Sequence, residues 1–167
     1  MGEIINRVVD SGIKTINIES WKIEGERSVI DLGDHLYKGL VLRENEFRAY
    51  LKNTDWTSYQ DHFVGIYCSL DAIIPNWAYM LLTSKLSGIA KKIVLGNKEE
   101  LESQMIIDQI REMDLSEYEN ERVIIKGCSD EVISEKAYLE LTVKLTPVVR
   151  SLMFGEPCSA VPVFKRE

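Results

Sequence analysis

Three cysteines are the residues of this sequence with the clearest chemistry. Each lies at or just beyond the end of a short apolar run, namely Cys68 in Phe63–Cys68, Cys128 after Arg122–Gly127 and Cys158 after Ser151–Phe154. Thiolates bind zinc and iron–sulfur clusters, and a thiolate of lowered pKa is also a nucleophile. A single cysteine is more often a small core residue, but three of three at strand ends predict a shared site.

Metal binding requires these thiolates to converge. If the apolar runs form a doubly wound sheet, the strands before Cys68 and Cys128 are neighbours about 4.8 Å apart, and the loop carrying Cys158 can reach over them. Tetrahedral thiolate ligands are separated by roughly 3.8 Å, so this spacing is suitable. Asp71 and Glu156, which lie near the outer two cysteines, are the candidate oxygen ligands. The predicted occupant is zinc or an iron–sulfur cluster with one open coordination position.

Other motifs of catalysis and cofactor binding are missing from the sequence. The absence of a C-x-x-C spacing excludes a zinc ribbon and a thioredoxin-like site. No glycine-rich loop has the length and following lysine of a phosphate cradle, so no nucleotide cofactor is expected. The two histidines, His35 and His62, are assigned surface or core roles. Asp71 also suits a structural role as an acidic residue near the start of the next helix.

A strand–helix alternation from residue 63 onward positions the cysteines. Strands are predicted at Phe63–Cys68, Lys92–Leu95, Arg122–Gly127 and Ser151–Phe154. Helices are predicted after Pro75, after Asn97 and near Ser134, and Asn97 with Glu100 forms a capping-box pattern. This alternation predicts a three-layer α/β fold with a mostly parallel sheet, whose carboxyl edge binds ligands. An α+β fold with an antiparallel sheet is the alternative.

The first third of the chain is strand-rich. Apolar and polar residues alternate over Thr15–Glu19 and Ser28–Leu32, and a charged helix is predicted at about Glu44–Lys52. We expect a small antiparallel or edge layer joined to the same core. Because no linker or repeat occurs, residues 1–167 are predicted to form a single domain, strand-rich over 1–60 and with strand–helix–strand repeats over 61–167.

Composition bounds the class of partner. The net charge of −7 and the lack of any basic run argue against nucleic acid. No apolar stretch approaches the ~20 residues that span a bilayer, and the first residues lack a signal-peptide pattern. We therefore expect a cytoplasmic protein without a membrane partner, and a homo-oligomer is left open.

Three segments carry a family resemblance. They are Cys68-Ser-Leu-Asp-Ala-Ile-Ile-Pro-Asn-Trp-Ala-Tyr-Met80, Lys126-Gly-Cys128 and Gly155-Glu-Pro-Cys-Ser-Ala-Val-Pro162. Together they resemble domain-of-unknown-function family 2480, a group of bacterial proteins, over nearly the whole chain. The resemblance implies a gene neighbourhood of iron–sulfur assembly and hence partners among iron–sulfur assembly proteins. It supplies no catalytic residues.

Three functions remain as hypotheses. The first is a metal-binding or iron–sulfur-assembly-associated accessory protein that uses the strand-end cysteines. The second is a cysteine-dependent sulfur-transfer enzyme, with Cys128 as nucleophile beside Lys126. The third is a non-catalytic interaction module, whose anchor would be Trp56 and Tyr59 if both are exposed. Core packing is the more usual role of such aromatic residues.

Overall fold

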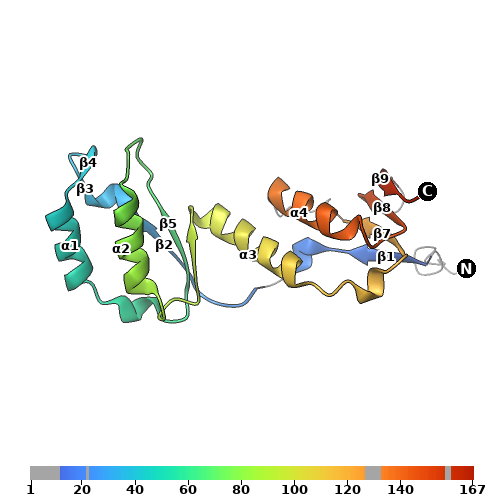
Figure 1. The fold of residues 1–167 in the computed structure, drawn as a ribbon, viewed down its shortest axis with the longest axis horizontal. Helices are drawn as coiled ribbons and strands as arrows, with labels where there is room; N and C mark the ends of the chain where they lie inside the picture. Colours follow the sequence, from blue (N-terminus) through green and yellow to red (C-terminus); the bar gives the residue numbers. More distant parts are fainter. Residues whose placement is uncertain (1–11, 22, 127–132, 157–158) are drawn as a thin grey trace, which may run out of the picture. The chain divides into compact units, whose positions relative to one another are not determined.

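The computed structural model describes residues 12–21, 23–126, 133–156 and 159–167. These residues form two compact units, each with its own sheet and core (Figure 1). Unit 1 contains the described residues within Met1–Lys22 and Met105–Glu167, and unit 2 contains Ile23–Gln104. Helix α3, Lys98–Glu112, runs through the boundary between the two ranges.

Unit 2 is built on a parallel three-stranded sheet with the order β2-β5-β6. The strands are β2 (Arg27–Asp31), β5 (Phe63–Tyr67) and β6 (Lys92–Leu95). The central strand is apolar and buried from Phe63 to Ile66, as expected of a parallel strand covered on both faces. Helices α1 (Glu44–Asn53) and α2 (Asn76–Leu86) lie side by side in Figure 1 and contribute Phe47, Leu51 and Leu82 to the core.

A short antiparallel hairpin follows β2 in unit 2. It consists of β3 (Leu36–Tyr37) and β4 (Val41–Leu42), joined by a turn in which Lys38 and Gly39 have positive φ angles. Because opposite residues of a hairpin project to the same face, Leu36 and Leu42 form one pair, and Tyr37 and Val41 form the other. Leu42 is buried, whereas Tyr37 and Val41 are exposed. The hairpin therefore has an inward and an outward face.

Unit 1 is built on a four-stranded sheet with the order β1-β7-β8-β9. Strands β1 (Ile13–Ile16), β7 (Arg122–Ile125) and β8 (Ser151–Phe154) are parallel, and β9 (Val161–Lys165) is antiparallel to β8. The core joins these strands to the second half of α3 and to α4 (Glu135–Leu145). Ile110, Leu141 and Leu145 are fully buried in it.

The strands and helices predicted from residue 63 onward are confirmed, and so is the α/β class with mostly parallel pairing. The strand expected at Thr15–Glu19 instead ends at Ile16, and Ile18–Ser20 form a 3₁₀ turn. All four strands expected from residue 63 onward are present, and α2, α3 and α4 begin where predicted. The Asn97 side chain accepts hydrogen bonds from the N–H groups of Glu99 and Glu100, and a Glu100 carboxylate oxygen accepts from the Asn97 N–H. The capping box at the start of α3 is therefore confirmed.

The expectation that these strands share one sheet is wrong. Strands β5 and β6 pair with β2, whereas β7 and β8 pair with β1 and β9. The strand-rich first third also forms no separate layer, because β1 and β2 each join one of the two sheets as a parallel edge strand. The local pattern of an apolar strand does not specify which partner covers it, and here the early strands take that role.

Candidate functional site

The carboxyl edge of the β2-β5-β6 sheet brings together two loops of unit 2. Asp31 and Tyr67 are the last residues of β2 and β5, and they are directly paired in the parallel register. The chain after Asp31 forms a 3₁₀ turn and then the hairpin, and the chain after Tyr67 forms the loop that leads to α2. This is the edge at which open α/β sheets commonly bind ligands.

Asp31 connects these two loops. One of its carboxylate oxygens accepts hydrogen bonds from the Gly33 N–H at 2.8 Å and from the Ser69 N–H at 2.9 Å. Burial by itself would raise the pKa of Asp31. Hydrogen bonds from Ser69, Gly33 and the Tyr67 hydroxyl outweigh that effect and hold the pKa below its ordinary value. Asp31 is therefore a charged anchor that fixes the relative positions of the two loops.

Cys68 begins the second loop and is half-buried. Its Sγ lies 3.3 Å from the Leu70 carbonyl oxygen, to which the thiol donates. Tyr79 of α2 lies near this thiol. Burial is the main cause that raises the pKa of Tyr79, and the charge of a Cys68 thiolate would raise the pKa of Tyr79 further. The thiol thus lies at the base of the loop that carries Leu70 and Ile73.

Five exposed apolar side chains lie on the outer ends of these loops. We call them the loop surface: Tyr37 (41% exposed), Leu40 (69%), Val41 (58%), Leu70 (44%) and Ile73 (93%). The two loops adjoin, because a methyl group on Gly39 of the hairpin turn would lie 3.6 Å from a Leu70 side-chain carbon. Contiguous exposed apolar residues of this kind mark interaction sites on soluble domains.

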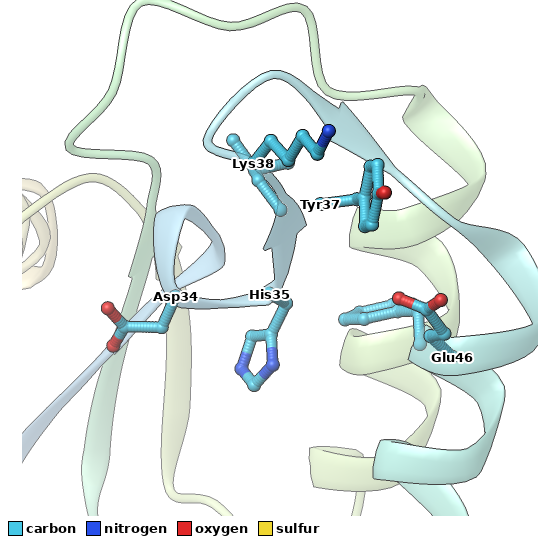
Figure 2. Close-up of a pocket in the computed structure, with 7 residues that line it drawn as sticks. Asp34, His35, Tyr37, Lys38 and Glu46 are labelled. Atoms are coloured by element: carbon cyan, nitrogen blue, oxygen red, sulfur yellow. The ribbon is translucent and has the colours of Figure 1, made fainter.

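A cavity of about 320 Å³ adjoins the loop surface at Tyr37. Figure 2 shows its lining residues, which are Asp34, His35, Leu36, Tyr37, Lys38, Glu46 and Phe47. The cavity is rimmed by both signs of charge, and the Asp34 carboxylate points away from Glu46, on the other side of the imidazole (Figure 2). The His35 ring lies against Tyr50, with ring centroids 3.9 Å apart. Burial lowers the pKa of His35, and the charges of Asp34 and Asp31 oppose that shift.

The predicted metal ligands are divided between the two units. Cys68 and Asp71 lie in the β5–α2 loop of unit 2, and Glu156 lies after β8 in unit 1, with its carboxylate 3.7 Å from Lys126 Nζ. Cys128 and Cys158 lie outside the described residues. Because β5 and β7 belong to different sheets, the argument that neighbouring strands bring Cys68 and Cys128 together is wrong.

The described part of the chain contains no group of three or more metal-binding side chains. Asp71 also has no capping role, because α2 begins at Asn76 with Pro75 as its N-cap. Within these ranges, no helix is long and apolar enough to cross a membrane.

The aromatic residues considered as an interaction anchor are packed in the core of unit 2. Trp56 is only 8% exposed, and its Nε1 donates a 2.9 Å hydrogen bond to the Leu51 carbonyl. Tyr59 is half-buried and stacks on Trp56 with ring centroids 5.9 Å apart. Their core role is confirmed, and the exposed apolar residues are found elsewhere.

Sequence reasoning missed both Asp31 and the loop surface. A signal for the surface was present, because Leu40 follows the turn pair Lys38-Gly39, and Leu70 and Ile73 flank Asp71 and Ala72 in a connection between a strand and a helix. Apolar residues in such connections belong neither to a strand face nor to a helix face. The bridging role of Asp31 had no comparable signal, because Ser69 is 38 residues away in the sequence.

Comparison with known proteins identifies one family. The family model described as protein of unknown function (DUF2480) matches residues 2–166, which confirms the resemblance over nearly the whole chain. No curated protein and no solved structure matches the chain.

Proposed function

The chain belongs to the DUF2480 family, and we propose that it is a non-catalytic accessory protein that docks an iron–sulfur assembly protein on the loop surface of unit 2. The observation that carries this proposal is the exposure of five apolar side chains on two adjoining loops, with Ile73 93% exposed. Exposed aliphatic side chains gathered on adjacent loops are expected where a second protein covers them.

The surroundings of the loop surface suit a protein interface. Arg43 and Lys38 lie over the Tyr37 ring, with the Arg43 Cζ atom 3.1 Å and the Lys38 Nζ atom 5.4 Å from the ring centroid. An apolar centre containing an aromatic residue, with charged side chains at its rim, is the usual composition of a non-obligate interface. The Asp31 hydrogen bonds hold the two loops together, so little ordering is required on binding.

Cys68 is the reason for choosing an iron–sulfur assembly protein as the partner. The thiol is half-buried at the base of the loop that carries Leu70 and Ile73, and it is bonded to the Leu70 carbonyl. Docking on this loop would bring the partner beside a thiol, which is the group needed to receive sulfur or to ligate iron. The gene neighbourhood implied by the family supports the same choice.

The test measures binding to purified iron–sulfur assembly proteins from the same source, a scaffold and a cysteine desulfurase, by calorimetry. Replacing Leu40 and Ile73 together by serine is expected to weaken binding by at least about ten-fold, because both side chains lose apolar contact area. Leu139→Ser with Val143→Ser is the matched control, since these side chains on α4 are 68% and 73% exposed. The control variant should bind as the wild type does.

A second readout uses the thiol. Alkylation of Cys68 by a maleimide should slow when the partner is bound, and mass spectrometry distinguishes this site from Cys128 and Cys158. Cys68→Ser should retain docking. Failure of both assembly proteins to bind, equal weakening by the two variant pairs, or self-association of the chain through Leu40 and Ile73 would each contradict the proposal.

A thiolate metal site in unit 1 is the second candidate. In favour of it, β7 and β8 are parallel neighbours, Cys128 and Cys158 follow them by three and four residues, and the ion pair of Lys126 with Glu156 links the two connections. Elemental analysis of protein purified without added metal, with an anaerobic absorption spectrum, tests this candidate. We expect about one equivalent of zinc or iron in the wild type, and loss of that metal in Cys128→Ser and in Cys158→Ser. Substoichiometric metal in the wild type would contradict this candidate.

Sulfur transfer by Cys128 stays a prediction, tested by thiol titration against pH.

A further inference from the structure

We propose that unit 1 contains a binding site for a phosphate group, in a cavity at the amino edge of its sheet. The cavity measures about 300 Å³, and the described residues that line it are Arg122, Arg150, Ser151 and Lys165. Three of these four side chains are cationic. The site is independent of the loop surface, which belongs to unit 2.

Strand register places these residues in a row. Arg122 is the first residue of β7 and pairs with Ser151, the first residue of β8, and Ser151 pairs in turn with Lys165 near the end of β9. Since neighbouring strands lie about 4.8 Å apart, Ser151 lies between Arg122 and Lys165 in the sheet. Arg150 directly precedes Ser151 and adds a second guanidinium at the same edge.

The row lies away from the core of unit 1. The next residues along the strands, Val123 and Leu152, are fully buried against α3 and α4. Because successive side chains of a strand alternate between faces, Arg122 and Ser151 belong to the opposite face. Arg122, Ser151 and Lys165, which pair across the three strands, are therefore on the sheet face that does not carry this helical core, and Arg150 lies at the edge of the sheet beside them.

The charge of this cavity contrasts with that of the whole chain, whose net charge is −7. Most other arginines on the described surface are neutralised by carboxylates: Arg27 by Glu102, Arg43 by Glu46, Arg48 by Glu44 and Arg111 by Glu140. Among the described residues, no carboxylate forms an ion pair with Arg150 or Lys165. The charges of Arg150 and Lys165 are therefore the part of this cavity suited to an external anion.

The chemistry of the row favours a phosphate group. Guanidinium groups match pairs of phosphate oxygens with two parallel N–H bonds, an ammonium adds a point charge, and a serine hydroxyl donates one further hydrogen bond. A cavity of about 300 Å³ holds inorganic phosphate or a small phosphate monoester, and it is too small to enclose an extended acidic peptide. Inorganic phosphate and glycerol phosphate are therefore the probes.

The experiment titrates the full-length protein with each probe by calorimetry, at low and moderate salt. Saturable binding of at least one probe is expected, and Arg150→Gln with Lys165→Gln should weaken it by about ten-fold or more. Arg122 is left unchanged because it also interacts elsewhere. Ser151→Ala should weaken binding about three-fold, since only one hydrogen bond is lost. Comparing the two probes shows whether the free ion or a monoester is preferred.

The matched control is Lys14→Gln with Lys136→Gln, which removes the same charge from exposed positions of unit 1 outside the cavity. This variant should bind phosphate as the wild type does, and the circular dichroism spectra of both double variants should equal that of the wild type. Absence of saturable binding to the wild type up to about 10 mM of either probe would overturn the proposal, on the affinity scale of weak ligands. Equal weakening in the cavity and control variants would also overturn it, because only the overall charge would then matter.

Discussion

Asp31 shows how one residue organises the carboxyl edge of unit 2. Its carboxylate accepts hydrogen bonds from the backbone N–H groups of Gly33 and Ser69, which lie in two loops far apart in the sequence. A carboxylate in this position accepts hydrogen bonds from loop N–H groups that have no partner within a strand or helix. Asp31 lies at the base of the loop surface and is not one of its five exposed residues. Its effect on stability can therefore be measured without a partner protein.

Asp31→Ala is expected to lower the free energy of unfolding by about 1 kcal/mol, because two N–H groups lose a charged acceptor and are partly solvated instead. Asp55→Ala is the matched control, since Asp55 accepts a similar bond from the Thr57 N–H but connects no second loop. Urea unfolding at pH 7 measures both variants. An effect no larger than that of Asp55→Ala would show that the bridge between the loops is not stabilising.

The Asp31 carboxylate also makes stability depend on pH. Its folded pKa is below the ordinary value of 3.8, so the unfolded chain binds more protons in the interval between the two pKa values. The stabilisation is therefore present above about pH 4 and is lost as the pH falls further. The loss of stability on acidification below pH 4 should be smaller in Asp31→Ala than in the wild type, as measured by urea unfolding at several pH values.

His35 has the corresponding effect near neutral pH. Burial against Tyr50 lowers its pKa below 6.5, so the unfolded chain binds the extra proton first as the pH falls through that value. Wild-type stability should therefore decrease between about pH 7 and pH 5.5. His35→Phe keeps the aromatic contact and should flatten this decrease. Identical pH profiles for wild type and His35→Phe would contradict the assignment.

At the scale of elements, the close approach of the β6–α3 connection to β5 depends on one glycine. A methyl group on Gly65 would lie 2.6 Å from the Gly96 carbonyl oxygen and 3.4 Å from that of Asn97. Gly96 itself has a φ of 148°, which L residues rarely adopt. The connection can therefore cover the central strand only where that strand lacks a side chain.

Gly65→Ala is expected to destabilise the protein by about 2 kcal/mol or more, because backbone atoms rather than a flexible side chain must move. Gly88→Ala is the control, since a methyl group there meets open space and introduces only the strain of a φ of 78°, about 1 kcal/mol. Thermal and urea unfolding compare the two. Equal destabilisation would mean that the connection moves away from β5 without resistance.

At the scale of the whole molecule, the division into two sheets predicts separable folding. Every buried residue of the core that contains Ile30, Val64 and Leu82 lies within Ile23–Gln104. The ion pair of Arg27 with Glu102 also lies within this range, at 2.8 Å. Each unit thus has the sheet and apolar core that an independent domain requires.

A fragment of residues 23–104 is expected to fold on its own. It should give an α/β circular dichroism spectrum and a cooperative urea transition, with a smaller m-value than the full chain because less surface is exposed on unfolding. Leu82→Ala within the fragment should lower its stability by about 2–5 kcal/mol, the range for a fully buried leucine. A fragment without a cooperative transition would show that unit 2 depends on the rest of the chain.

The sequence by itself determined the elements of this protein. Asn97 with Glu100, Ser134 before α4, and the apolar run of β5 act through residues a few positions away, so capping and periodicity identify them directly. The family was also identifiable from the sequence, because its characteristic segments are continuous stretches of the chain.

Only the tertiary structure decided which strands pair and which loops meet. β7 has the pattern of a buried strand whether its neighbour is β5 or β1, and the choice rests on contacts between residues about 110 positions apart, such as Ile13 and Arg122. The loop surface and the basic cavity depend on such pairings, through Gly39 and Leu70 in one case and Ser151 and Lys165 in the other. Long-range pairing reflects competition among many similar apolar strands for the same partners, and no local pattern records which pairing buries the most surface.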